Sequence, residues 1–181
     1  MALTSTIYNL DIALAHVDRG VYEDLSLRVP MHPSESPEYF VTRVLAYCLE
    51  HAEGIGFSRG ISDPDEPTLA VRDLTGALRS WIEIGAPDAS RLHKASKASP
   101  RVAVYTHRDP LMLQRQLSGE KIHRGDDVEL YAIDRELIAE LANRLERRTR
   151  LELSVSDGML YVVLGGETLS GSVERYPLQP G

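Results

Sequence analysis

Three carboxylates and two lysines that could bind and hydrolyse a phosphate ester lie in one short stretch of the chain. The carboxylates are Asp65, Glu66 and Glu83, and the lysines are Lys94 and Lys97. Hard divalent cations such as Mg²⁺ take oxygen ligands, usually one or two carboxylates together with water and substrate phosphates. Carboxylates that hold such a cation, with a lysine that stabilises developing charge, are typical of metal-assisted phosphodiester hydrolysis.

Local folding predicts that these carboxylates meet at one end of a hairpin. The predicted hairpin consists of a strand, a turn and a returning strand, over Thr68–Asp73, Leu74–Ala77 and Leu78–Gly85. A turn centred on Thr75 and Gly76 places Glu83 of the second strand opposite Thr68 of the first. Asp65 and Glu66 directly precede the first strand, so they fall beside the end of the second.

The same acids have a simpler interpretation as ion-paired surface groups. A polar hairpin end whose carboxylates pair with Arg59, Arg72 or Arg91 needs no metal ion. The residues alone leave both interpretations open.

Length and charge limit the classes of function. A chain of 181 residues is about one domain and can bury one proper core. Its net charge of −7 counts against tight non-specific nucleic-acid binding, which depends on Lys and Arg. It does not exclude a nuclease, because a bound metal neutralises active-site acids. Arg91, Lys94, Lys97 and Arg101 form a basic strip that is either a phosphate-facing surface or a solvated helix face.

The cysteine content and the hydropathy pattern predict a cytoplasmic protein with no membrane association. The first residues have neither the basic nor the apolar region of a signal peptide, and no apolar run approaches the roughly 20 residues of a membrane span. The one cysteine, Cys48, allows no internal disulfide and suits a reducing compartment. It lies within a helical apolar pattern, which predicts a small buried hydrophobic residue.

Periodicity predicts one mixed α/β domain over residues 1–181 with a β-hairpin at each end. Period-two alternation gives strands on both sides of residues 16–20, and Asp157-Gly158 is a type I′ turn signal between two further strands. The other predicted elements are a helix from a Ser36 cap to about Gly54, a loop over residues 57–60, a helix over about 88–98, a strand over 102–105, a helix over 109–117, a strand over 128–133, a helix from an Asp134 cap to about Arg147, and a weaker strand from Thr168.

Short motifs along nearly the full length of the chain resemble the bacterial YaeQ family. They are Asp18-Arg19, His32-Pro33-Ser34-Glu35, Arg43-Val44-Leu45-Ala46, Phe57-Ser58-Arg59-Gly60, Asp65-Glu66-Pro67, Trp81-Ile82-Glu83-Ile84-Gly85 and Pro87-Asp88. The resemblance implies a compact α/β fold with a mixed central sheet flanked by helices, similar to a variant of the PD-(D/E)xK, restriction-endonuclease-like nuclease superfamily. It also implies, as a weaker alternative, a transcription-related partner.

The resemblance assigns roles to particular acids. The helix-borne acid of the superfamily pattern resembles Glu38, or Glu35 as the alternative, while the acid before the second strand resembles Asp65 and the strand acid resembles Glu83. Asp65 and Glu83 would then hold Mg²⁺ or Mn²⁺, and Glu66 or Glu38 would assist.

The chain departs from the superfamily pattern at the lysine. The pattern asks for Lys two residues after the strand acid, where this chain has Gly85. In some members that lysine has moved to the following helix, where Lys94 and Lys97 are available on roughly one face. Two hypotheses follow, a Mg²⁺-dependent nuclease or phosphodiesterase with a displaced lysine, and a non-catalytic module of the same fold that binds nucleic acid or a protein.

Overall fold

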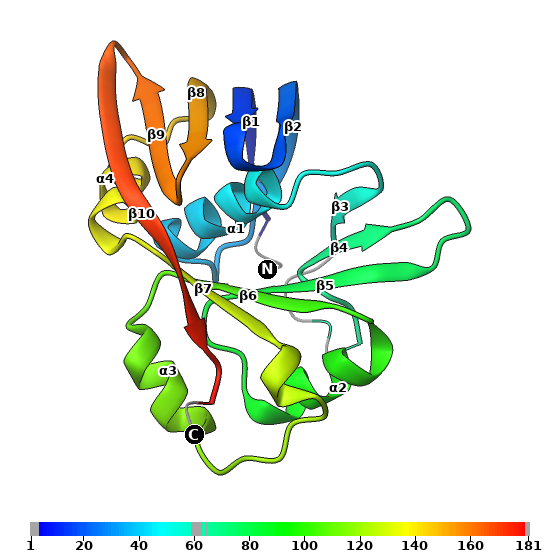
Figure 1. The fold of residues 1–181 in the computed structure, drawn as a ribbon. Coiled ribbons are helices and arrows are strands. Elements are labelled where there is room, and N and C mark those ends of the chain that lie inside the picture. The colour runs from blue at the N-terminus through cyan, green and yellow to red at the C-terminus, as the bar shows by residue number, and fades with distance from the viewer. Residues whose placement is uncertain (1–3, 59–62, 64, 180–181) are drawn as a thin grey trace. The chain divides into compact units, whose positions relative to one another are not determined.

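The structure, a computed structural model, describes residues 4–58, 63 and 65–179. The chain forms two compact units, of which unit 1 comprises residues 1–41 and 133–173, and unit 2 comprises residues 42–132 and 174–181. Both units combine strands with helices, as Figure 1 shows, so the predicted mixed α/β fold class is confirmed. The single domain predicted over residues 1–181 stays a prediction.

Unit 1 is built on a sheet with the strand order β2-β1-β8-β9-β10. Its elements are β1 (Thr6–His16), η1 (Val17–Arg19), β2 (Val21–Met31), α4 (Arg135–Asn143), β8 (Arg148–Ser156), β9 (Met159–Leu164) and β10 (Glu167–Pro177), whose last residues belong to unit 2. β1 and β2 pair antiparallel over their whole length, which confirms the predicted N-terminal hairpin. Alternation along β1 buries Leu10, Ile12 and Leu14 on one face of the sheet.

Contacts between residues far apart in the sequence hold unit 1 together. β1 pairs in parallel with β8, so that Asn9 lies beside Arg148. The carboxylate of Asp18 accepts hydrogen bonds from the backbone N–H groups of Asp157, at 2.8 Å, and Gly158, at 3.2 Å, and these bonds lower the pKa of Asp18. Asp157 and Gly158 have φ angles of 51° and 73°, which confirms the predicted type I′ turn.

Unit 2 contains the segments predicted to carry chemistry. Its sheet has the strand order β7-β6-β5-β4-β3, in which β5, β6 and β7 run parallel. Its elements are most of α1 (Pro37–Leu49), β3 (Ile55–Phe57), β4 (Leu69–Arg72), β5 (Leu78–Ile84), α2 (Ala89–Ala98), β6 (Val102–Thr106), α3 (Pro110–Leu117), η2 (Gly125–Asp127) and β7 (Glu129–Ile133). The side chains of Asp88 and Asp109 accept hydrogen bonds at the starts of α2 and α3, where the sequence predicts that helices begin.

The core of unit 2 lies between α2, α3 and one face of the sheet, as Figure 1 shows. Trp81 of β5 is 2% exposed within this core. Cys48 is buried as predicted, and burial raises the pKa of its thiol to about 12. No helix among the described residues is long and apolar enough to span a membrane.

The structure corrects two helix ends and one loop. Ser36 caps α1 as predicted, with its hydroxyl accepting from the Tyr39 N–H, but the helix ends at Leu49 rather than near Gly54. Ile55–Phe57 forms strand β3 where a loop was predicted from residue 57, and residues 59 and 60 of that loop lie outside the described residues. α4 ends at Asn143 rather than near residue 147, because residues 147 and 148 pair with β1.

Candidate functional site

The predicted hairpin is confirmed in β4 and β5, with a bulge between Val71 and Arg72 that the predicted turn does not contain. Leu69 pairs with Ile82, which places Thr68 beside Glu83. The Thr68 hydroxyl donates a hydrogen bond to Glu83 Oε2 at 3.4 Å. Asp73 shapes the turn between the strands, because its carboxylate accepts from backbone N–H groups inside the turn.

Glu83 is a buried carboxylate whose oxygen atoms are both occupied by donors of the protein. The residue is 3% exposed. Trp81 Nε1 donates to Glu83 Oε1 at 2.6 Å, and Arg91 Nε donates to Glu83 Oε2 at 2.8 Å. Burial of a carboxylate is costly unless it is paired and hydrogen-bonded, and Arg91 supplies the compensating charge. The ion pair with Arg91, one of three pairings that the sequence leaves open, is therefore confirmed.

Arg91 also binds the segment that precedes β4. Its Nη1 donates to the carbonyl of Asp63 at 3.1 Å, and its Nη2 donates to the carbonyl of Glu66 at 2.8 Å. Asp88 caps α2 and accepts from the Arg91 backbone N–H at 2.8 Å, which fixes the start of the helix that carries Arg91. A single guanidinium therefore ties Glu83 to the segment that contains the other two predicted acids.

The predicted lysines occupy other positions. Lys94 forms an ion pair with the carboxylate of Asp65, and both side chains are mostly exposed. Lys97 is exposed in the last turn of α2. The donors to Glu83 come from Thr68, Trp81 and Arg91 rather than from a lysine. Arg91 therefore takes the place beside Glu83 that the sequence predicts for a lysine, while Asp65 and Lys94 pair with each other.

The acids assigned to the helix lie in unit 1. Glu38 is in the first turn of α1. Glu35 is 8% exposed, and its Oε1 accepts a hydrogen bond from the His32 N–H at 3.2 Å. The prediction that Glu38 or Glu35 shares a site with Asp65, Glu66 and Glu83 stays a prediction.

The donor set around Glu83 does not suit a resident divalent cation. Within residues 4–58, 63 and 65–179, no group of three or more His, Cys, Asp or Glu side chains could hold a metal ion. Asp65 is paired with Lys94, and Glu83 is paired with Arg91. A cation would have to displace both partners to bind the two predicted ligands. The Mg²⁺ or Mn²⁺ ion at Asp65 and Glu83 stays a prediction that this arrangement does not favour.

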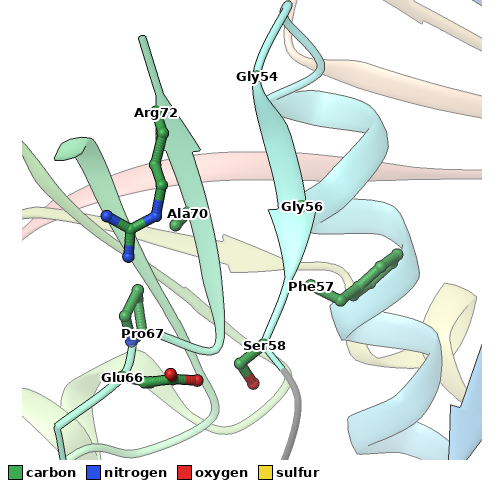
Figure 2. Close-up of a pocket in the computed structure, with 8 residues that line it drawn as sticks. All are labelled: Gly54, Gly56, Phe57, Ser58, Glu66, Pro67, Ala70 and Arg72. Atoms are coloured by element: carbon green, nitrogen blue, oxygen red, sulfur yellow. The ribbon is translucent and has the colours of Figure 1, made fainter. Parts of the chain in front are cut away.

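A pocket of about 420 Å³ opens beside Glu66 on one face of β3 and β4. Small residues form much of its lining, because Gly56 and Ala70 lie opposite each other in the two strands. Figure 2 shows the guanidinium of Arg72 and the carboxylate of Glu66 on either side of Pro67. The volume is within the range of small-molecule sites. Glu66 therefore contributes its carbonyl to Arg91 and its side chain to a pocket that sequence reasoning did not find.

A second polar cluster, centred on Arg101, lies on the opposite face of β5 from Trp81 and Glu83. Arg101 Nε donates to Glu129 at 2.8 Å, and its Nη atoms donate to both carboxylate oxygens of Glu50. The side chains of Glu50 and Glu129 are only 10% and 17% exposed. Burial opposes the charge of Arg101, but its hydrogen bonds to both carboxylates raise the pKa of the guanidinium. The partners come from distant parts of the sequence, so periodicity alone does not reveal the cluster.

Two tyrosines complete the Arg101 cluster. Tyr105 donates to Glu50 at 2.7 Å, Tyr131 donates to Glu129, and the two rings stack with centroids 5.0 Å apart. Burial, followed by the hydrogen bond to Glu129, raises the pKa of Tyr131 to about 12.

The high pKa of Tyr131 predicts a loss of stability at alkaline pH. The folded protein holds the phenol proton up to about pH 12, whereas an unfolded chain releases it near pH 10. The free energy of unfolding should therefore fall as the pH rises from about 10 to about 12. Urea unfolding across this range measures the decrease, and Tyr131→Phe should make it shallower without removing it, because burial also raises the pKa values of Tyr105 and Cys48. An equal decrease in Tyr131→Phe would contradict the assignment.

A comparison with family models matches residues 1–173 to the model described as YaeQ protein. Two relatives are each called uncharacterized protein YaeQ. The protein from Escherichia coli strain K12 is 30% identical over 163 residues, and the protein from Salmonella typhi is 29% identical over 163 residues. In both comparisons the match covers 90% of this chain and 90% of the relative.

Two crystal structures of YaeQ proteins have the same fold. The protein from Pseudomonas syringae aligns with a TM-score of 0.85 and 28% identity, covering 94% of this chain and 95% of its own. The protein from Xanthomonas axonopodis pv. citri aligns with a TM-score of 0.86 and 27% identity, covering 98% of this chain and 100% of its own.

Proposed function

The chain belongs to the YaeQ protein family, and from this premise we propose that it is a non-catalytic binding module with a nuclease-like fold. The observation that carries the proposal is the ion pair between Arg91 and the buried carboxylate of Glu83. A nuclease of the PD-(D/E)xK type uses the corresponding acid to bind a cation. In this chain a guanidinium supplies the positive charge, so Glu83 is compensated without a metal.

The remaining contacts of Arg91 support a role in shaping a binding surface. Arg91 holds the carbonyls of Asp63 and Glu66, and Glu66 in turn lines the pocket beside β4. A side chain that donates to three groups fixes their relative positions more tightly than a single ion pair would. The acids that bind a metal in a nuclease would here, through Arg91, hold the binding surface in a fixed geometry.

The proposal predicts how Mn²⁺ affects thermal unfolding. Mn²⁺ should leave the melting temperature of the wild-type protein unchanged, because both oxygens of Glu83 are occupied. In Arg91→Met the carboxylate is buried without a counter-charge, so this variant should melt at a lower temperature than the wild type with or without Mn²⁺. The double variant Arg91→Met/Glu83→Gln should recover part of the loss, because it removes the stranded charge. Calorimetric titration of Mn²⁺ into the same three proteins provides an independent readout, and saturable binding to wild type that vanishes in Glu83→Gln would overturn the proposal.

A Mg²⁺-dependent nuclease is the second candidate. It is favoured by the contacts of Arg91, which join the Glu83 carboxylate to the segment that carries Asp65 and Glu66, since Mg²⁺ sites often complete their shell with substrate phosphates. Incubation of plasmid DNA and of RNA with Mg²⁺ separates the two candidates. Cleavage that requires both Mg²⁺ and Glu83 would establish the nuclease, with Glu83→Gln as the control for contaminating activity.

A further inference from the structure

Positive charge is concentrated in one part of this acidic chain. Residues 89–125 contain eight Lys or Arg residues and two Asp or Glu residues, a net charge of +6, although the whole chain carries −7. The three lysines of the chain, Lys94, Lys97 and Lys121, all fall in this segment, while its other cationic residues are arginines. Arg91 and Arg101 are paired with carboxylates from outside this segment, so its exposed positive charge comes from the three lysines and from the other arginines.

Folding brings two parts of this segment together. The backbone N–H of His123 donates to His93 Nδ1 on α2 at 2.9 Å, and the two imidazole rings meet edge to face with centroids 6.2 Å apart. Arg124 Nη2 donates to the carbonyls of Ser96, at 2.6 Å, and Ser99, at 3.0 Å, at the end of α2. Figure 1 shows the chain before β7 running against α2. We call the three lysines together with His93 and His123 the lysine surface.

The charges of the lysine surface lie close enough to act on one another. The pKa of His93 is lowered, first by burial and then by the positive charges of Lys97, His123 and Lys121. Lys94, Lys97, Lys121 and His123 are all exposed. Lys94 is paired with Asp65, but both partners are largely in solvent, and such a pair opens at little cost.

The use of lysine on this surface differs from the use of arginine elsewhere in unit 2. Arg91 and Arg101 hold buried carboxylates in fixed geometry. Lysine carries a compact, hydrated charge on a flexible stem, which suits contacts that follow a charged backbone without fixed partners. Contacts of this kind to phosphates dominate the affinity of nucleic-acid binding.

We propose that the lysine surface binds the phosphate backbone of a nucleic acid, an inference that rests on the proposed function as a binding module and names its partner. The contacts are electrostatic and made to phosphate oxygens, so the surface selects charge rather than base sequence. An acidic protein is the competing partner, and the test below separates the two.

Fluorescence anisotropy with a labelled DNA duplex, in buffer with EDTA, tests the proposal. The wild-type protein should bind the duplex, and the logarithm of its affinity should fall linearly with the logarithm of salt concentration. Removal of the three lysine charges should reduce the magnitude of this slope by about 3 and weaken binding by about 100-fold at 0.1 M salt. The test variant is Lys94→Gln/Lys97→Gln/Lys121→Gln.

Two matched variants make the result specific. A triple Lys→Arg variant at the same positions keeps the charges and should bind as the wild type does. A triple Arg→Gln variant in unit 1 loses the same net charge from exposed positions and should retain the wild-type salt slope; it changes Arg135, Arg148 and Arg150. Equal weakening by the two charge-removing variants, or no binding of the duplex by wild type, would overturn the proposal. Tighter binding of poly-glutamate than of DNA would identify an acidic protein as the partner and overturn it as well.

The failure of this inference and the failure of the proposed function give different results. EDTA removes divalent cations, so binding in this assay does not depend on a metal site. If the duplex binds through the lysine surface but is cut when Mg²⁺ is added, the module is catalytic and only the proposed function fails. If Mn²⁺ has no effect on wild type and the duplex does not bind, only the partner inferred here is wrong.

Discussion

Arg101→Met should lower the free energy of unfolding by about 3 kcal/mol, because it removes the guanidinium that pairs with both Glu50 and Glu129. Breaking a buried ion pair typically costs about 3–5 kcal/mol, and the 34% exposure of Arg101 places this change at the lower end. The melting temperature should fall by about 6–12 °C for a chain of this size. Urea unfolding monitored by circular dichroism measures the change.

A surface ion pair provides the matched control for Arg101. Arg79 pairs with Asp73 at 3.0 Å, but its side chain is 64% exposed. Arg79→Met should therefore cost less than about 1 kcal/mol. Neutralising the stranded acids should recover part of the loss, so Arg101→Met/Glu50→Gln/Glu129→Gln should be more stable than Arg101→Met. A cost for Arg101→Met no greater than that for Arg79→Met would show that the cluster does not stabilise unit 2.

Gly54→Ala should destabilise the protein by at least about 3 kcal/mol, because the new methyl group has no space. A Cβ atom at Gly54 would lie 1.9 Å from the carbonyl oxygen of Arg72, which is backbone and cannot rotate away. The residue also has a φ angle of +89°, which L side chains rarely adopt. The Arg72 N–H donates to the Gly54 carbonyl at 3.0 Å, so relief of the clash would break the pairing between β3 and β4.

Gly56 is the internal control for this prediction. It lies two residues further along the same segment, yet a Cβ atom there would meet nothing within 4 Å. Gly56→Ala should change the free energy of unfolding by less than about 1 kcal/mol. Equal midpoints for Gly54→Ala and Gly56→Ala in urea unfolding would contradict the close approach of the two backbones. A selective effect at Gly54 would instead support the geometry that forms the neighbouring pocket.

The fold was predictable where local signals agree with tertiary pairing. The β4–β5 register follows from a short turn whose Asp73 bonds its own backbone, and this places Thr68 beside Glu83. The errors arise where a distant strand determines the structure. The apolar stripe of α4 continues to Leu145 in the sequence, but Asn9 binds the carbonyl of Arg147, which commits that segment to the sheet. Strand β3 has three residues, too few for a periodic signal.

The candidate site was predictable in its members but not in its pairings. Sequence proximity identifies Asp65, Glu66 and Glu83, and it names Arg91 among possible partners. It does not show that the Trp81 indole and the Arg91 guanidinium donate hydrogen bonds to the Glu83 carboxylate. The contact with Arg91 depends on the packing of α2 against β5. The contacts of Arg101 with Glu50 and Glu129, and the contact between His93 and His123, join residues 28 to 51 positions apart, beyond the range of any local pattern.

The parallel pairing of β1 with β8 also determines the order in which the chain can fold during synthesis. Residues 42–132 supply most of unit 2 and leave the ribosome before β8 is made. At about 5–20 residues per second, the N-terminal hairpin waits of the order of 10 s for its neighbouring strand. During that time one edge of β1 lacks its partner, and an unpaired strand edge is a template for association with other chains. β1 is therefore made long before the strand that protects its edge.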